Sequence, residues 1–186
     1  MGIAIANELA ADGADVTLVC GPVYLRELYP GIKLLPVTTA EDMLINCTSL
    51  FEKSDGAILS AAVADFRPAS PAPKKIKKSD RSMTLLLEST PDIAAALGKM
   101  KKSNQFLIGF ALETDDELQN ASKKLTDKNF DFVVLNSLKD KGAGFSFDTN
   151  KITIIDRDNK ITNFKLKPKT EVARDIVDHL ENFLSC

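Results

Sequence analysis

The sequence predicts a single α/β domain with a mostly parallel sheet between two layers of helices. Two observations support this. Apolar runs of strand length alternate with helical segments along almost the whole chain. The 186 residues, 44% hydrophobic and 27% charged, are also enough to bury one core of ordinary globular composition. We therefore expect one domain over residues 1–186.

The first half of the chain indicates helix, strand, helix and strand. An alanine-rich opening helix meets Gly13, a residue that can adopt the left-handed conformation that stops a helix. The run VTLVC, residues 16–20, predicts a buried strand. Threonine hydroxyls open a helix over residues 38–53, and GAILSAAVAD, residues 56–65, predicts an apolar strand with its polar residues at the end.

The second half continues the alternation. Thr90 opens a helix in which Pro91 takes the first position, and a hairpin turns at Asp158-Asn159. The expected elements are a strand at 83–88, a helix at 90–101, a strand at 105–113, a helix at 115–128, a strand at 130–136, the hairpin at 151–166 and a closing helix at 170–183.

Several residues lie just after the apolar runs of these strands. In open parallel sheets, ligands bind at the carboxyl ends of the strands, so these residues are candidates for a site. They are Ser60, Ala61 and Asp65 after the strand near Ile58, Phe110, Glu113 and Thr114 at the end of the next parallel strand, and Asn136 after VVL.

The stretch PAPKKIKKSDR, residues 71–81, concentrates positive charge in a chain whose net charge is -2. Flexible lysines can close over a polyphosphate and neutralise its charge, but runs of this kind more often remain solvated. The start of the helix near Pro91 offers backbone N–H groups to the same anion, although Asp92 would compete for them.

Composition excludes several classes of protein. A net charge of -2 argues against a surface built to neutralise nucleic-acid phosphates. No apolar run approaches the roughly 20 residues of a membrane span, and no leader-like segment opens the chain. Three cysteines without metal-ligand spacing predict reduced thiols and a cytoplasmic protein.

The order of the motifs is more specific than any one of them. SAAVADFRP, KIKK, STPDI, IGFALET, a helix with Lys124 and Lys128, and DFVVLN follow one another along the chain. In this order they resemble phosphopantothenoylcysteine synthetase, the phosphopantothenate-cysteine ligase of coenzyme A biosynthesis. The opening MGIAIANELAADGADVTLVCGP is similar to the first helix and second strand of that family. The resemblance implies a three-layer, Rossmann-like, mostly parallel sheet with a C-terminal β-hairpin.

The resemblance implies a CTP-dependent reaction. In the bacterial type, the carboxylate of 4'-phosphopantothenate attacks the α-phosphate of CTP, pyrophosphate leaves, and the amine of cysteine displaces CMP from the acyl-cytidylate. Mg²⁺ and lysines would stabilise the phosphate charge. CTP is thus the expected co-substrate, while the eukaryotic preference for ATP keeps ATP open.

By the same resemblance, Lys75 is the catalytic contact to the triphosphate and acyl-cytidylate, and Lys77, Lys78 and Asn136 are supporting residues. The metal ligands stay unknown. The other implied nucleotide-binding residues are Ser60, Ala61, Ala62, Asp65, Pro91, Asp92, Ile93, Ala94, Phe110, Lys124 and Lys128.

Each of these residues also has a plainer interpretation. The lysines on the loop and on the helix would be solvated, Phe110 would be core, and Asn136 would hold a turn. Asp65 and Arg67 would form an ion pair at the strand end, and an exposed ion pair contributes little to the stability of the fold.

One departure from the family concerns the start of the chain. Family members place a glycine- and threonine-rich strand end and an asparagine- and arginine-containing region ahead of the residues that match Met1 and Gly2. We expect the first strand, in the middle of the sheet, to be missing here and turnover to be impaired. The flavin-dependent decarboxylase often fused ahead of the domain is absent too, so no flavin is expected in this domain.

The family further implies a homodimer with substrate sites near the subunit interface, and the hairpin at 151–167 is a plausible edge to contribute. Fusion to, or association with, the decarboxylase is also implied. Rival classes are a Rossmann-type nicotinamide-dependent oxidoreductase, which lacks its G-x-G-x-x-G here, and a non-catalytic nucleotide-binding module. A nucleic-acid-binding module would predict more basic surface and interleaved aromatic residues, so we expect no nucleic-acid partner and no membrane partner.

Overall fold

A five-stranded sheet forms the centre of the molecule. The computed structural model describes all residues except 24–26, 73, 78–81, 114, 138–146 and 186. The strand order is β10-β9-β7-β6-β3. The bounds of these strands are β3 Gly56–Leu59, β6 Phe106–Glu113, β7 Phe132–Ser137, β9 Ile152–Asp156 and β10 Ile161–Asn163.

Strands β3, β6 and β7 are parallel, whereas β9 and β10 form the antiparallel hairpin at the far edge. Asn159 has a φ of 58° in the turn of this hairpin, where the sequence predicts it. The mostly parallel sheet with a C-terminal hairpin is therefore confirmed.

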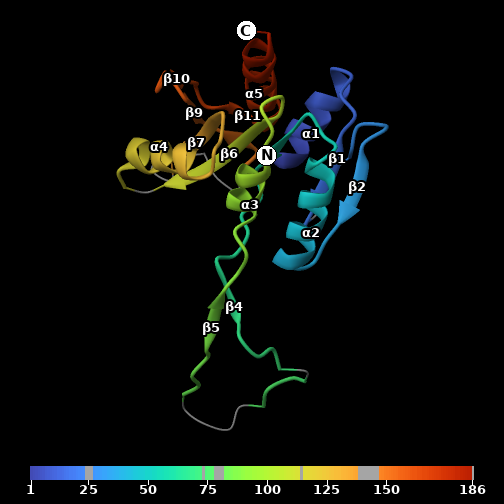
Figure 1. Cartoon of the computed structure of the whole chain (residues 1–186), viewed down its shortest axis with the longest axis vertical. Helices are drawn as coiled ribbons and strands as arrows, with labels where there is room; N and C mark the ends of the chain where they lie inside the picture. Colours follow the sequence, from blue (N-terminus) through green and yellow to red (C-terminus); the bar gives the residue numbers. More distant parts are fainter. Residues whose placement is uncertain (24–26, 73, 78–81, 114, 138–146, 186) are drawn as a thin grey trace.

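Helices cover both faces of the sheet, giving three layers (Figure 1). One core cluster joins the sheet to α1 (Gly2–Ala11) and α5 (Lys169–Leu184). The other joins it to α2 (Ala40–Phe51), α3 (Ile93–Met100) and α4 (Glu117–Asp127). Alternate residues of β7 serve the two clusters, because successive side chains of a strand point to opposite faces: Phe132 and Val134 face α5, and Val133 and Leu135 face α4.

Local signals fix several helix ends as the sequence predicts. Gly13 has a φ of 95° just after α1, a backbone conformation that favours glycine. Thr39 caps α2 with a complete capping box, in which its hydroxyl accepts from Asp42 N–H and the Asp42 side chain accepts from Thr39 N–H.

Strand β1 (Thr17–Cys20) departs from the prediction of a buried strand. It pairs in parallel with β2 (Lys33–Pro36), a strand that the sequence does not predict, and the two form a separate sheet. Neither strand is fully buried. Within the described residues no pairing joins β1 to β3, so each of these two strands has one edge without a strand partner.

A long arm leaves the body after β3 and returns at α3 (Figure 1). Its strands are β4 (Phe66–Pro68), which is also unanticipated, and β5 (Leu87–Ser89), which is shorter and later than the strand predicted at 83–88. Within the described part of the chain they pair only with each other. The apolar residues Met83, Leu85 and Leu86 are exposed because the arm has no helix layer over it.

The prediction that Thr90 opens the following helix is wrong. Thr90 belongs to the base of the arm, where its N–H donates to Asp65 O at 2.9 Å and its hydroxyl donates to Ala64 O. Asp92 caps α3 instead, two residues later, and Pro91 therefore precedes the helix.

Candidate functional site

The carboxyl ends of β3, β6 and β7 meet at one edge of the sheet because the three strands are parallel. Ser60 follows β3 there, and Asn136 lies near the end of β7. The start of α1 comes close to the same edge, since a Cβ on Gly2 would lie 2.5 Å from Ser60 Oγ. Glycine thus allows the first turn of α1 to approach the strand end.

The start of α3 is the most elaborate part of this region. Asp92 Oδ1 accepts a hydrogen bond from Ala95 N–H at 2.9 Å, and Asp92 Oδ2 pairs with Lys128 Nζ. Desolvation favours the neutral acid, but the hydrogen bonds from Lys128 and Ala95 outweigh it and hold the pKa of Asp92 below its ordinary value. The expected competition of Asp92 for the helix N-terminus is therefore observed.

The side chains of Ile93 and Ala94 pack into the core cluster beneath α3. Any contact that these two residues make with a ligand has to come from their backbone groups, as the resemblance implies for this turn. Gly98 brings the end of α4 against α3, because a Cβ at this position would lie 2.1 Å from Lys128 O. Asn129 Nδ2 donates to Gly98 O at 2.9 Å and holds the same junction.

Lys124 and Lys128 lie one turn apart at the end of α4, as predicted. Lys128 is half-buried and faces Asp92, so the structure brings together two of the predicted nucleotide-binding residues from separate helices. Lys124 is exposed.

Phe110 lies on the other face of the sheet. Its ring packs against the cluster that joins the sheet to α1 and α5, whereas α3 and α4 lie on the opposite face. Phe110 and Lys128 therefore do not meet across the sheet, and a ligand that touches both has to pass over the edge of the strands.

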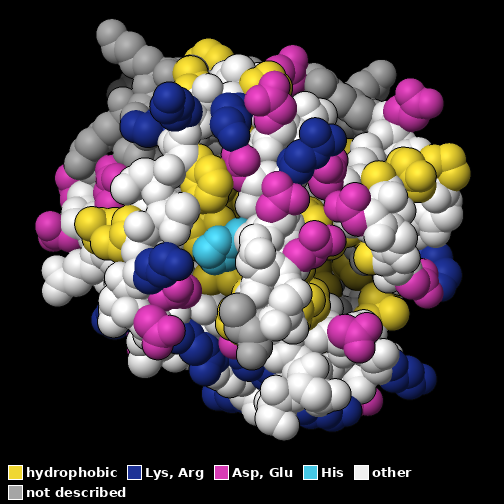
Figure 2. Space-filling view, turned by 90° about the horizontal axis from the view of Figure 1, so that it is seen from above, with side chains coloured by type: hydrophobic (Ala, Val, Ile, Leu, Met, Phe, Trp, Pro, Cys, Tyr) yellow, Lys and Arg dark blue, Asp and Glu magenta, His cyan; other side chains and the backbone are white. Residues whose placement is uncertain are grey.

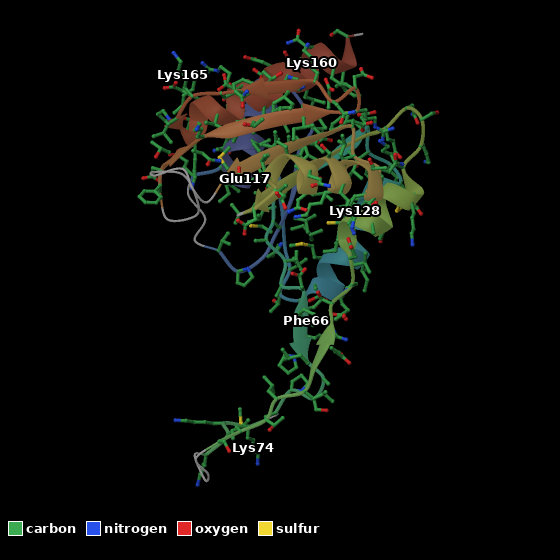
Figure 3. All side chains as sticks on the ribbon, turned by 90° about the vertical axis from the view of Figure 1, so that its left-hand side faces the viewer. Phe66, Lys74, Glu117, Lys128, Lys160 and Lys165 are labelled. Atoms are coloured by element: carbon green, nitrogen blue, oxygen red, sulfur yellow. The ribbon has the colours of Figure 1, made fainter. Side chains whose placement is uncertain are left out.

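The lysine run lies on the arm, away from the body. Figure 3 shows Lys74 at the far end of the arm, with Phe66 between it and Lys128. Lys75 and Lys77 are exposed on the same segment, and Lys78 lies outside the described residues. Within one chain, Lys74 and Lys128 are thus far apart.

Ala61, Ala62 and Asp65 are exposed where the chain leaves β3 for the arm. Arg67 fixes the base of the arm, since its Nε donates to Glu88 Oε1 at 2.8 Å and its Nη1 pairs with Glu41 of α2. The predicted ion pair between Asp65 and Arg67 is not the one formed, because Glu88 lies opposite Arg67 in the ladder.

Asn150 was not predicted from the sequence. It lies on β8 (Thr149–Asn150), is only 1% exposed, and donates from Nδ2 to Asn136 Oδ1 at 3.0 Å. No sequence signal marks it, since a single asparagine before an apolar strand usually belongs to a turn.

No group of three or more histidine, cysteine, aspartate and glutamate side chains that could hold a metal ion occurs in the described part of the chain. Among those same residues, no helix is long and apolar enough to cross a membrane. Figure 2 shows acidic and basic side chains interspersed on one end of the molecule rather than gathered into a field of one sign.

Comparison with known proteins identifies the family. The family described as "DNA/pantothenate metabolism flavoprotein C-terminal domain" matches residues 1–184. The chain belongs to this family. The resemblance to phosphopantothenoylcysteine synthetase is thereby confirmed.

Two curated relatives and one solved structure show how much is shared. The chain is 56% identical to a "Cysteine/Cysteine sulfinic acid decarboxylase" of an unknown prokaryotic organism, over 95% of this chain and 49% of the relative. It is 41% identical to the coenzyme A biosynthesis bifunctional protein CoaBC of Bacillus subtilis, over 97% of this chain and 44% of the relative. The chain thus spans about half the length of these relatives.

The crystal structure of the C-terminal domain of a CoaBC protein matches with a TM-score of 0.81 and 35% identity, covering 99% of this chain and 82% of that chain. The fold and the family therefore agree over nearly all of this chain.

Proposed function

We propose that this family domain carries the phosphopantothenate-cysteine ligase activity of coenzyme A biosynthesis, with CTP as the co-substrate. The observation that carries the proposal is the junction of α3 and α4, where Lys128 meets Asp92 beside the Ile93–Ala94 turn. It places cationic side chains next to a helix start, as a nucleotide requires.

In the first step, a carboxylate oxygen of 4'-phosphopantothenate forms a bond to the α-phosphorus of CTP, and the bond to the bridging oxygen breaks, releasing pyrophosphate. Negative charge accumulates on the phosphate oxygens during this step. Lys128 and Lys124 lie where they can receive a nucleotide bound at the start of α3, and the exposed Lys75 supplies a further cation.

In the second step, the amine of cysteine attacks the acyl carbon, the bond from this carbon to the phosphate oxygen breaks, and CMP leaves with the electron pair. The amine loses its proton as the amide forms. A free carboxylate has a poor leaving group, and the nucleotide phosphate replaces it with a good one.

Mg²⁺ in this proposal arrives with the nucleotide. The described residues offer no cluster of three metal-binding side chains, and Mg²⁺ in nucleotide sites is commonly held by substrate phosphates, waters and one or two carboxylates. Bound there, it would neutralise phosphate charge.

The exposed arm supports our proposal of a homodimer. Phe66, Leu86 and Leu87 are exposed on a two-stranded ribbon that has no other layer to cover it, and isolated ribbons of this kind are marginally stable in water. In a dimer with two-fold symmetry, the arm of each subunit can cover these apolar residues on the arm of the other. Since Lys74 lies far from Lys128 within one chain, Lys75 would then serve the site of the partner subunit.

The unpaired edges of β1 and β3 support the expectation of a further central strand. A parallel strand between them would join the two sheets into one, and its loop would complete the edge at Ser60 and Gly2. We propose that turnover depends on this strand, whichever polypeptide segment supplies it.

The name of the relative at 56% identity raises cysteine decarboxylation as a second candidate. The chain covers only 49% of that relative, so its activity can reside in the other half. In the bifunctional CoaBC relatives two activities share one protein, which supports fusion of this domain to a decarboxylase. We propose a cytoplasmic location, because three cysteines without metal-ligand spacing are typical of reduced thiols.

Calorimetric titration with CTP and then ATP, in the presence of Mg²⁺, tests the nucleotide part of the proposal. We expect selective binding of CTP that weakens at least tenfold in Lys75→Ala. Lys165→Ala is the matched control, because this lysine is exposed at the opposite end of the molecule (Figure 3). Equal weakening in both variants would show a non-specific charge effect and contradict the role of Lys75.

The chemistry is tested by release of pyrophosphate that requires 4'-phosphopantothenate, followed by release of CMP that requires cysteine. Both are measured on this chain and on the same chain with a family strand placed ahead of Met1. Carbon dioxide formed from cysteine without nucleotide would instead support the decarboxylase. Absence of CTP binding by both chains would overturn the proposal.

A further inference from the structure

Asn150 is a buried amide with one defined partner and one missing partner. Its Nδ2 donates to Asn136 Oδ1 at 3.0 Å, while its Oδ1 is buried without a hydrogen bond among the described residues. Buried polar atoms are nearly always paired, and an unpaired one costs free energy. The exception therefore requires an explanation.

The backbones of both residues are held by strand pairing. Asn136 lies between Leu112 of β6 and Ile152 of β9. Asn150 pairs with Lys167 of β11 (Lys167–Pro168). Rigid elements on two sides thus place the two amides against each other.

The hydrogen bond between them selects one orientation of Asn136. A carboxamide offers one acceptor oxygen and two N–H donors. Because Asn150 occupies Oδ1 of Asn136, the groups that Asn136 can turn to the carboxyl edge are its Nδ2 donors. Such donors bind oxyanions and carbonyl oxygens.

We propose that Asn150 is a positioning residue, which orients the Asn136 amide so that its N–H groups bind an oxyanion of the substrates. The inference rests on the proposed ligase function, because the oxyanion belongs either to the phosphates of CTP or to the carboxylate or phosphate of 4'-phosphopantothenate. Asn136 is half-buried near the end of β7, at the edge that also receives Ser60.

Because Oδ1 of Asn150 is unpaired, the positioning role predicts a particular effect of substituting Asn150 on the melting temperature. Asn150→Leu removes the unpaired Oδ1 from the core, which offsets the loss of the hydrogen bond to the half-buried Asn136, so the melting temperature should change little. A residue retained only for the fold would behave in the opposite way, losing stability without a specific loss of binding.

The experiment combines binding with a double-mutant cycle. CTP with Mg²⁺ and 4'-phosphopantothenate are titrated separately into the parent chain, Asn150→Leu, Asn136→Ala and the double variant. We expect each single variant to weaken one probe at least tenfold and the double variant to weaken it no further, since Asn150 acts through Asn136. The probe that responds identifies which oxyanion is bound.

Asn163→Leu is the matched control. Asn163 also bonds to a neighbouring side chain, accepting from Thr153 Oγ1 at 2.9 Å, but it is exposed on the terminal hairpin. The variant Asn163→Leu should bind CTP and 4'-phosphopantothenate with the same affinities as the parent chain. The proposal is overturned if Asn150→Leu binds both probes like the parent, or if the two single losses multiply in the double variant.

A ligand-free measurement separates this inference from the ligase function. In the parent chain, the side-chain amide of Asn136 should be rigid by ¹⁵N relaxation, and in Asn150→Leu it should become mobile. An amide that is equally mobile in both chains refutes the positioning role. If the amide responds but the parent binds neither probe, the substrate class assigned to Asn136 falls together with the proposed function.

Discussion

Lys128 at the end of α4 forms an ion pair with Asp92, the residue that caps α3. The pair joins two helices on the same face of the sheet and brings together residues that are 36 positions apart in the sequence. The ion pair therefore holds two predicted nucleotide-binding elements together, the turn at the start of α3 and the lysine at the end of α4.

The cap of α3 can be separated from the ion pair by substitution. Asp92→Ala removes both and should lower the free energy of unfolding by roughly 1–2 kcal/mol, while Asp92→Asn keeps an acceptor for Ala95 N–H and should lose less. Urea unfolding at neutral pH measures both. Equal losses would mean that the charge, rather than the cap, carries the stability.

Gly98 should tolerate no side chain. In Gly98→Ala, the new Cβ would overlap Lys128 O, so α3 and the end of α4 must move apart, at a cost of about 1–3 kcal/mol. Affinity for CTP should fall as Lys128 shifts. Gly21→Ala is the matched control, since nothing lies within 4 Å of its Cβ, and it should unfold like the parent chain. A stable Gly98→Ala protein would contradict the close packing.

Asp131 lies in a buried ion pair just before β7. Its oxygens accept from Lys101 Nζ at 2.8 Å, and Oδ2 also accepts from Leu107 N–H at 2.7 Å. Asp131→Ala leaves the Lys101 ammonium buried and unpaired, and should cost about 3–5 kcal/mol in urea unfolding.

The control for Asp131 is Asp15→Ala, which breaks the exposed pair with Lys33 and should cost less than about 1 kcal/mol. Burial lowers the pKa of Lys101, the charge of Arg157 lowers it further, and Asp131 opposes both effects. If Asp131→Ala and Asp15→Ala lower the free energy of unfolding equally, burial does not determine how much an ion pair contributes to stability.

His179 should make stability depend on pH near neutrality. Its ring lies edge-on to Phe132, with the centroids 4.9 Å apart. Desolvation is the largest effect on its pKa and lowers it. The charge of Asp156 raises the pKa by a smaller amount, and the charge of Lys160 lowers it slightly. The unfolded chain therefore binds the proton more tightly, and stability is lost as pH falls below the unfolded pKa of about 6.5.

Urea unfolding from pH 7.5 down to pH 5.5 tests this, with His179→Gln as the comparison. The difference between the parent and the variant should shrink as the pH falls. A difference that stays constant across this range would contradict the lowered pKa.

The arm should carry the dimer interface. Leu87 on the arm and Leu118 on α4 are almost equally exposed, at 49% and 48%. Leu87→Asp should convert a dimer into a monomer in sedimentation velocity, whereas Leu118→Asp should leave the dimer intact. A parent chain that sediments as a monomer at micromolar concentration would exclude the arm as a stable interface.

The alternation of strands and helices could be predicted from the sequence because its causes are local. Gly13, the Thr39 capping box and the turn at Asn159 act within a few residues, and apolar periodicity identifies the sheet and its layers. Thr90 shows the limit of such reasoning, since a threonine before Pro91 has the pattern of a cap but hydrogen-bonds to Ala64 and Asp65 across the arm.

The order of short motifs identified the family and the residues to examine, all without coordinates. Tertiary structure alone decided which of them meet: Lys128 reaches Asp92, Phe110 packs on the opposite face, and the arm holds Lys74, the neighbour of Lys75, away from Lys128. It also revealed Asn150, whose partner Asn136 is set by strand register. Local propensity acts along the chain, whereas these contacts depend on how separate elements pack, and no short stretch of sequence encodes that.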